Sequence, residues 1–291
     1  MAGRPKLPYL VFDENSLNLK FYTQFDEWFL NRKVEILSTI LEDPELLGRF
    51  SGEDQTEIER TKQSLGAEIL FAQFHLFETF FAMLLAPFQD LPHWIFLSTY
   101  ETGDIKEKAR QFVAGQVNEL SNGMFTSMAD FLTYSIFDCY APKIEEDELK
   151  TRIADMNTLG WLITRMAQRY LKGDEYNSYK HGLRIVASRF RLAASVGNAV
   201  PTNLIDATHS ITHLKLGRGE DGTTVHVETK AFNPKEFQTY VNYMSILLSN
   251  MKSVRTAKLK GSTFVDVQTL NEIDIKAILN LETIGSWTFP A

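Results

Sequence analysis

Cysteine is almost absent from this chain of 291 residues, which contains Cys139 alone. A single thiol excludes an internal disulfide framework and a zinc site built on thiolates, and it is typical of a reducing compartment. Cys139 lies in the apolar run 136–140 with no candidate base beside it in the sequence. We therefore expect a buried structural residue rather than a nucleophile.

An uninterrupted hydrophobic run is also missing. Residues 1–8 carry charge and two prolines instead of the apolar centre of a secretory signal. The most hydrophobic window, residues 67–88, is interrupted by Glu68, Gln73, His75 and Glu78. Such a window predicts a core helix and not a membrane span. We expect a cytoplasmic protein without a membrane partner.

Several catalytic motifs are lacking. The chain has no Walker loop, no Gly-x-Ser-x-Gly and no Cys-x-x-Cys, so nucleotide-fold enzymes and α/β-hydrolases are not expected. It also has no internal repeat, no low-complexity tract and no Gly/Ser-rich linker. A single domain over residues 1–291 is the simplest interpretation, with a separate small unit after Pro201 as the alternative.

The composition is that of an ordinary globular protein, with 44% hydrophobic and 23% charged residues. Phenylalanine is abundant, with 21 copies, which predicts a core rich in aromatic contacts. The formal net charge of −7 argues against a protein that coats DNA, although a local basic patch could still bind phosphates.

Helical periodicity dominates the first two thirds of the chain. Apolar residues recur at helical spacing in five segments: residues 16–41, 54–85, 105–120, 125–140 and 145–171. Residues 89–102 predict an irregular connection. Asp43-Pro44 ends the first segment, and Pro87 and Pro142 follow later helices. The second helix begins with charged residues and continues with apolar ones, so we expect it to start at the surface and enter the core.

The period changes after Pro201. Residues 209–218 and 223–232 alternate apolar and polar side chains around the glycine-rich turn 217–222, which predicts a β-hairpin over about 209–231. Asn233-Pro234 then predicts a closing helix over about 234–254. In the tail, residues 262–291, a strand over 263–269 and a helix over 271–281 are weaker expectations. The predicted fold is mainly α, a multi-helix bundle (core about 16–200) with one late β-hairpin insertion.

The segment from Gly173 to Arg184 carries the densest group of chemically capable side chains. Gly173 suits a left-handed helix end and Asp174 an N-cap, so we expect a helix over about 175–191. Its polar face would contain residues separated by whole turns: Asn177, His181, Arg184, Ser188 and Arg191. The residues of its apolar face would be Tyr176, Tyr179, Leu183, Val186 and Phe190.

The sign of the charge reverses in this segment. Residues 180–191 contain four cations (Lys180, Arg184, Arg189 and Arg191) and no acid, in an acidic chain. A solvated basic face is one interpretation. An anion or RNA site is the other, with His181 transferring a proton, Arg184 pairing with a phosphate, Asn177 orienting one of them, and Lys180 and Arg191 adding charge.

Two further polar groups invite a metal hypothesis. Glu68, His75 and Glu78 share roughly one face of the second helix, but the chain has no Glu-x-x-His pair of the kind that binds di-iron centres. His209, His213 and His226 alternate on the hairpin without a convincing fourth ligand. We therefore predict no metal and no cofactor, and we expect Glu78 or His75 to face and orient the Lys180–Arg184 surface.

The run Asn177-Ser-Tyr-Lys180-His181-Gly182, set in a helical bundle, resembles the HEPN-type helical proteins. It is also similar to an uncharacterised bacterial family with an Asn-x-x-Lys-His-Gly helix start. In the HEPN ribonuclease motif, four to six residues separate an arginine from the histidine that follows it. Here Asp174, Glu175 and Tyr176 stand in those places, so the resemblance implies binding of RNA, or of a partner in a defence or toxin system, more than RNA cleavage.

Three functions follow for testing. The first is binding of RNA or another phosphate-bearing ligand through Asn177, His181 and Arg184, with Lys180, Arg191, Glu78 and His75 in support. The second is a non-enzymatic interaction or structural protein that forms a homodimer. The third is a helical-bundle metalloprotein.

Overall fold

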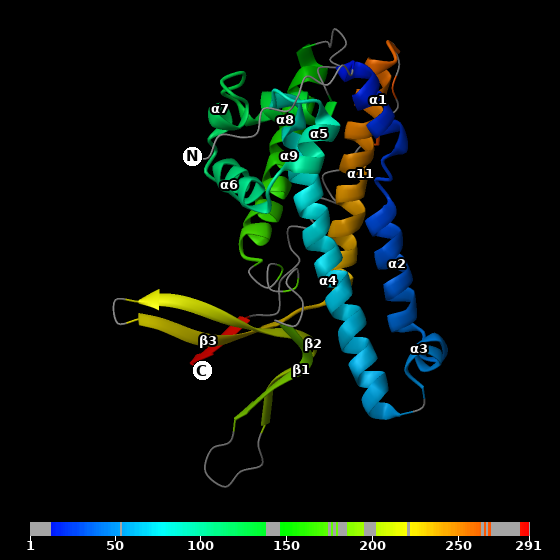
Figure 1. The fold of residues 1–291 in the computed structure, drawn as a ribbon, viewed down its shortest axis with the longest axis vertical. Helices are drawn as coiled ribbons and strands as arrows, with labels where there is room; N and C mark the ends of the chain where they lie inside the picture. Colours follow the sequence, from blue (N-terminus) through cyan, green and yellow to red (C-terminus); the bar gives the residue numbers. More distant parts are fainter. Residues whose placement is uncertain are drawn as a thin grey trace.

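The computed structural model of this protein is mainly helical, with an antiparallel sheet late in the chain (Figure 1). It describes residues 13–52, 54–137, 146–173, 176, 179, 185–194, 202–219, 222–262, 265, 267–268 and 286–290. The predicted fold class is confirmed. Cys139 lies outside the described residues.

The described helices come in the following order along the chain. They are α1 (Glu14–Gln24), α2 (Phe29–Glu42), α3 (Pro44–Ser51), α4 (Gln55–Leu85), the 3₁₀ turn η1 (Ala86–Phe88), α5 (His93–Thr99), α6 (Thr102–Val113), α7 (Val117–Leu120), α8 (Met128–Phe137), α9 (Glu146–Leu171) and α11 (Pro234–Leu259).

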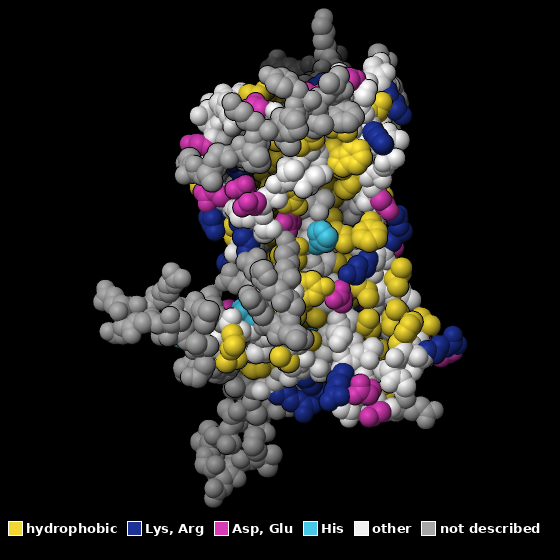
Figure 2. Space-filling model, in the orientation of Figure 1, with side chains coloured by type: hydrophobic (Ala, Val, Ile, Leu, Met, Phe, Trp, Pro, Cys, Tyr) yellow, Lys and Arg dark blue, Asp and Glu magenta, His cyan; other side chains and the backbone are white. Residues whose placement is uncertain are grey.

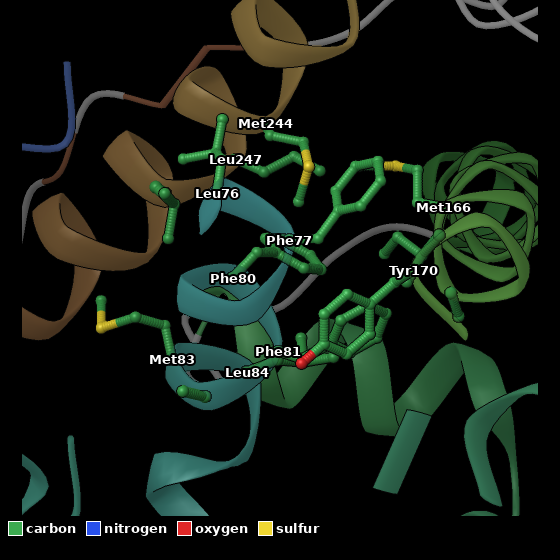
Figure 3. Packing of buried hydrophobic residues seen from close by; sticks show 14 of the residues in the cluster. Leu76, Phe77, Phe80, Phe81, Met83, Leu84, Met166, Tyr170, Met244 and Leu247 are labelled. Atoms are coloured by element: carbon green, nitrogen blue, oxygen red, sulfur yellow. The ribbon is translucent and has the colours of Figure 1, made fainter. Parts of the chain in front are cut away.

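Helix α4 is the centre of the fold. Its N-cap is Asp54, whose carboxylate accepts a hydrogen bond from the Thr56 amide. The first turns are exposed, and nearly every residue from Gly66 to Leu85 is buried. The expectation that this helix starts at the surface and enters the core is confirmed. Figure 3 shows Phe77, Phe80 and Phe81 of α4 packed between α9 and α11.

The apolar half of α4 is covered by protein. Together with η1 it is the one helix among the described residues that is long and apolar enough to cross a membrane, but 89% of its most hydrophobic window is buried inside the protein. The window predicted as a core helix is therefore a core helix in this fold.

The predicted helix over residues 16–41 is two helices, α1 and α2. The chain is extended at Phe25, and the Asp26 carboxylate accepts a hydrogen bond from the Trp28 amide in the turn between them. Lys252 of α11 donates to the Phe25 carbonyl at 2.6 Å and to Glu27 at 2.6 Å. A contact from the far end of the chain thus stabilises a break that helical periodicity does not reveal.

Three cations bind carbonyl groups at the ends of helices far from them in sequence. Lys252 binds the end of α1, Arg255 donates to the Ser135 carbonyl in the last turn of α8 at 2.8 Å, and Lys230 donates to the Lys172 carbonyl after α9 at 2.8 Å. The last carbonyls of a helix lack intrahelical partners and form the negative end of its dipole. These contacts satisfy those carbonyls and join the helices.

Smaller differences from the sequence predictions are local. Residues 93–99, expected to be irregular, form α5, and the predicted helix 105–120 is divided into α6 and α7 at Gly115, whose φ of 70° favours glycine. The Asp43 cap with Pro44, the long helix α9, and the Asn233-Pro234 start of α11 are confirmed.

The sheet has four described strands in the order β1-β2-β3-β4, all antiparallel: β1 (Ile185–Ala194), β2 (Thr202–Gly219), β3 (Gly222–Ala231) and β4 (Ser286–Pro290). The predicted hairpin is confirmed, with Gly219 opposite Gly222. The sheet is larger than one hairpin because β1 and β4 pair with its outer edges. It lies at one end of the helical bundle (Figure 1).

The glycines of the hairpin turn match a known spacing by coincidence. Gly217, Gly219 and Gly222 are spaced as in the Gly-x-Gly-x-x-Gly fingerprint of dinucleotide-binding folds. That fingerprint needs a helix after the strand, to bind the pyrophosphate. Here β2 pairs directly with antiparallel β3, so the spacing belongs to a tight hairpin.

The tail after α11 is described only in part. Of the predicted strand over 263–269 and helix over 271–281, only residues 265, 267 and 268 are described, and they lie in no strand. Asn250 of α11 exchanges two hydrogen bonds with the Gln268 backbone, at 2.7 and 2.8 Å. These bonds attach this point of the tail to α11.

Candidate functional site

The sequence-predicted site is described at its two flanks. Asn177, Lys180, His181 and Arg184, as well as Asp174, lie outside the described residues. Gly173, Tyr176 and Tyr179 are described before Lys180, and β1 follows Arg184.

Gly173 is a glycine for reasons of space. Its φ is not positive, so the expected left-handed helix end is wrong. A Cβ atom at Gly173 would lie 2.4 Å from Cε1 of Phe74, a ring that is fully packed in the core. The backbone after α9 thus runs directly against α4, and any side chain here would displace a core aromatic ring.

Tyr176 and Tyr179 attach the next turns of chain to α4. The Tyr176 ring stacks on Phe74 at a centroid distance of 5.5 Å, and the Tyr179 ring stacks on Phe71 at 3.9 Å. Their hydroxyls donate to Glu78 at 3.2 Å and to Glu68 at 3.0 Å. The sequence pattern placed both tyrosines on the core side, but it contained no sign of their carboxylate partners.

Glu78 is a buried carboxylate surrounded by hydroxyl groups. It is 4% exposed, and it accepts hydrogen bonds from Thr102 of α6 at 2.7 Å and from Tyr176. Burial and the Glu78 charge raise the pKa of Tyr100 to about 12, and they also raise the pKa values of Tyr170 and Tyr176. Tyr176 is therefore a neutral hydroxyl donor to Glu78 near neutral pH.

The predicted polar stripe of α4 divides into three different environments. Glu78 is buried, Glu68 is partly exposed and pairs with Lys33 of α2 at 2.8 Å, and His75 is exposed. Glu78 contacts the chain after Gly173 through Tyr176. The expected approach of Glu78 or His75 to the Lys180–Arg184 surface lies outside the described residues.

Arg191 does not belong to a helix face. The predicted helix over 175–191 is wrong from Ile185 onward, because residues 185–194 form β1 and pair with β2. Ser188 bonds Ser210 across the strands, and Arg191 is exposed opposite Asp206. Val186, expected on the apolar face, is 62% exposed. The apolar and polar residues of this segment fit both the helical and the strand period. Pairing with β2 makes the segment a strand.

The three hairpin histidines are not a metal site. Among the described residues no group of three or more His, Cys, Asp or Glu side chains could hold a metal ion. His213 is buried beside Glu228, with Nε2 to Oε2 at 3.5 Å, and Glu228 also lies 3.8 Å from Lys230. His209 packs against Gly66, where a Cβ would come within 2.5 Å of its Nδ1. Burial lowers the pKa of His209.

A cavity of about 230 Å³ lies beside His209, where α2, β2 and the start of α11 meet. Its lining includes Ser38, Glu42, Thr208 and Lys235. Lys235 and Glu42 form an ion pair at 3.0 Å, and both side chains are exposed. The lysine charge is thus already compensated.

A second buried polar centre, at the other end of α11, is not foreseen by the sequence patterns. Arg255 is 2% exposed and donates to the Tyr22 hydroxyl at 3.0 Å and to the Ser135 carbonyl. The Tyr22 oxygen lies 2.6 Å from Nδ1 of His93, whose backbone N–H donates to Asn18. Burial, followed by the charges of Arg255 and Lys258, lowers the pKa of His93 to about 3.

A signal for Arg255 existed in the sequence. It lies four residues after Met251, in the apolar stripe of α11 that contains Met244 and Leu248. A cation in such a stripe is expected to be buried and to need acceptors. Periodicity gives no information on what those acceptors are.

Comparisons of the chain with protein-family models, with curated proteins and with solved structures returned no match.

Proposed function

We propose that this chain is a HEPN-like cytoplasmic protein that binds RNA, or another phosphate-bearing ligand, through the basic run between Lys180 and Arg191. The observation that carries the proposal is the reversal of charge: four cations and no acid in a chain of net charge −7. Cations with this local density bind phosphates and release counterions.

The described flanks support this proposal. Tyr176 and Tyr179 attach the chain before the basic run to α4, and two cations of the run, Arg189 and Arg191, are exposed on β1. In the proposed site, Arg184 and Arg191 pair with phosphate oxygens, and Lys180 adds positive charge. If the ligand is cleaved, His181 transfers the proton and Asn177 orients it.

The test is the binding of labelled single-stranded RNA at several salt concentrations. His181→Ala, Arg184→Ala and Arg191→Ala are compared with Arg49→Ala, which removes an exposed cation that forms an ordinary pair with Glu45. Removal of one cation that binds a phosphate should reduce the salt slope by about 0.7. Gel analysis of the same RNA tests cleavage. Equal binding by all variants, or no binding by the wild type, contradicts the proposal.

One observation favours an interaction protein as the second candidate. Val186 of β1 and Leu214 of β2 are 62% and 61% exposed, and the register places them on one face of the sheet. Hydrophobic side chains are visible over the sheet in Figure 2. If this face joins two copies, Val186→Asp with Leu214→Asp should convert a dimer to a monomer in sedimentation experiments. A wild-type monomer would contradict this candidate.

A further inference from the structure

Two carboxylates of α4 each connect the chain after Gly173 to another helix. Glu68 accepts from the Tyr179 hydroxyl at 3.0 Å and from Lys33 of α2 at 2.8 Å. Ten residues later, Glu78 accepts from the Tyr176 hydroxyl at 3.2 Å and from Thr102 of α6 at 2.7 Å. The same chemical arrangement, a tyrosine and a second donor on one carboxylate, thus occurs twice along one helix.

The aromatic rings make these attachments directional. Tyr179 lies nearly parallel to Phe71, at 11°, and Tyr176 lies at 18° to Phe74. A stacked ring fixes a plane, and a hydrogen bond from its hydroxyl fixes the rotation within that plane. Two such tyrosines, three residues apart, hold the chain against α4 at two points.

We propose that Glu68 and Glu78 are positioning residues for the basic run: through Tyr179 and Tyr176 they hold against α4 the part of the chain from which that run begins. This inference rests on the proposed binding of RNA by that run. The carboxylates touch no ligand, and they act by reducing the conformational freedom that binding would otherwise remove.

Glu68 and Glu78 differ in whether a role in positioning can be measured separately from a role in folding. Glu78 is buried, so its replacement also disturbs the core. The side chains of Glu68 and Lys33 are 36% and 38% exposed, so their ion pair contributes little to stability. Changes at Glu68 and Tyr179 therefore separate positioning from folding.

The experiment compares Tyr179→Phe and Glu68→Met with two matched controls. Tyr179→Phe keeps the stack on Phe71 and removes only the hydroxyl. Glu68→Gln keeps an oxygen that accepts from Tyr179, and Lys33→Met removes the other partner of Glu68. Amide hydrogen exchange of peptides from residues 173–191 is measured without ligand, and RNA affinity and thermal stability are measured on the same samples.

We expect Tyr179→Phe and Glu68→Met to accelerate exchange in these peptides about 2- to 10-fold and to weaken RNA binding by a similar factor, which is the range for one hydrogen bond. Glu68→Gln and Lys33→Met should stay within about twofold of wild type, since the Tyr179 bond remains. Rescue by Glu68→Gln distinguishes positioning from a general loss of structure.

The outcomes separate the two proposals. Unchanged exchange in Tyr179→Phe and Glu68→Met overturns the inference. Faster exchange with unchanged RNA affinity overturns it as well, because the contacts then hold the chain without affecting binding. If wild type binds no RNA but exchange responds as expected, the proposed function fails, whereas the two carboxylates still hold the chain against α4 at Tyr176 and Tyr179.

Discussion

Two buried polar centres among the described residues, one at Glu78 and one at Arg255, carry opposite charges and solve the same problem. At Glu78 a carboxylate is surrounded by hydroxyl donors from Thr102 and Tyr176. At Arg255 a guanidinium donates to the Tyr22 hydroxyl and to the Ser135 carbonyl. An isolated buried charge is costly unless it is paired or hydrogen-bonded. The hydrogen-bond partners described above for these two groups are neutral dipoles.

A third centre shows the alternative. Arg169 of α9 and Glu236 of α11 form an ion pair at 2.5 Å, and the guanidinium stacks on Phe237 at 4.4 Å. Here the charges neutralise each other, and the pair joins two helices. The dipolar centres instead join several elements at once: Arg255 connects α1, α8 and α11, and Glu78 connects α4, α6 and the chain after Gly173. Neutral hydrogen-bond partners thus join three elements at each of these centres, whereas the ion pair joins two helices.

The largest expected effect is at Arg255. Arg255→Ala leaves the Ser135 carbonyl without its donor and opens a cavity, so the free energy of unfolding should fall by about 3 to 5 kcal/mol. Urea denaturation measures this, with the exposed Lys260→Ala as a control expected within about 0.5 kcal/mol. Arg255→Met keeps most of the volume. If Arg255→Met were as stable as wild type, the hydrogen bonds of the guanidinium would contribute nothing net.

The centre at Arg255, which includes His93, should also make the free energy of unfolding fall in acid. The pKa of His93 is about 3 in the folded state against an ordinary value of 6.5. Its contribution is therefore fully present above pH 6.5 and is lost as pH falls toward 3, by on the order of 3 to 5 kcal/mol. Denaturation of wild type and His93→Asn across this range measures the difference, because asparagine keeps an acceptor for Tyr22 but does not titrate. Parallel curves for the two proteins would contradict the assignment.

The smallest loss of stability is expected at the Glu78 centre. Glu78→Gln keeps the shape but sets an amide N–H₂ against a hydroxyl donor, so it should cost about 1 to 2 kcal/mol. A double-mutant cycle with Thr102→Val measures the coupling. Additive losses would mean that Thr102 and Glu78 do not stabilise each other. A loss as large as that of Arg255→Ala would remove the contrast between the two centres.

The local parts of the fold were predictable from the sequence. Helix α4 was predicted to within a residue at each end, because Asp54 caps it and its apolar period is regular. The hairpin followed from alternation around a glycine-rich turn. Helix α11 followed from Asn233-Pro234. In each case the determining residues are neighbours in the chain.

The candidate site was predictable only in part. Tyr176 and Tyr179 were correctly assigned to the core side, whereas Arg191 was placed on a helix face and lies instead on β1. Residues 185–191 satisfy both the helical and the strand period, and their pairing with β2 is a non-local contact. The expected roles of Asn177, Lys180, His181 and Arg184 remain sequence predictions, because these residues lie outside the described part of the chain.

The sequence by itself determined where the chain forms helices and a hairpin and which faces are apolar, because caps, turns and periodicity act over a few residues. Only the tertiary structure decided that α1 ends where Lys252 reaches it, that residues 185–194 are a strand, and which dipoles surround Glu78 and Arg255. These features depend on partners far along the chain. A polar residue in an apolar stripe indicates that a buried partner is needed, but it does not indicate which residue that partner is.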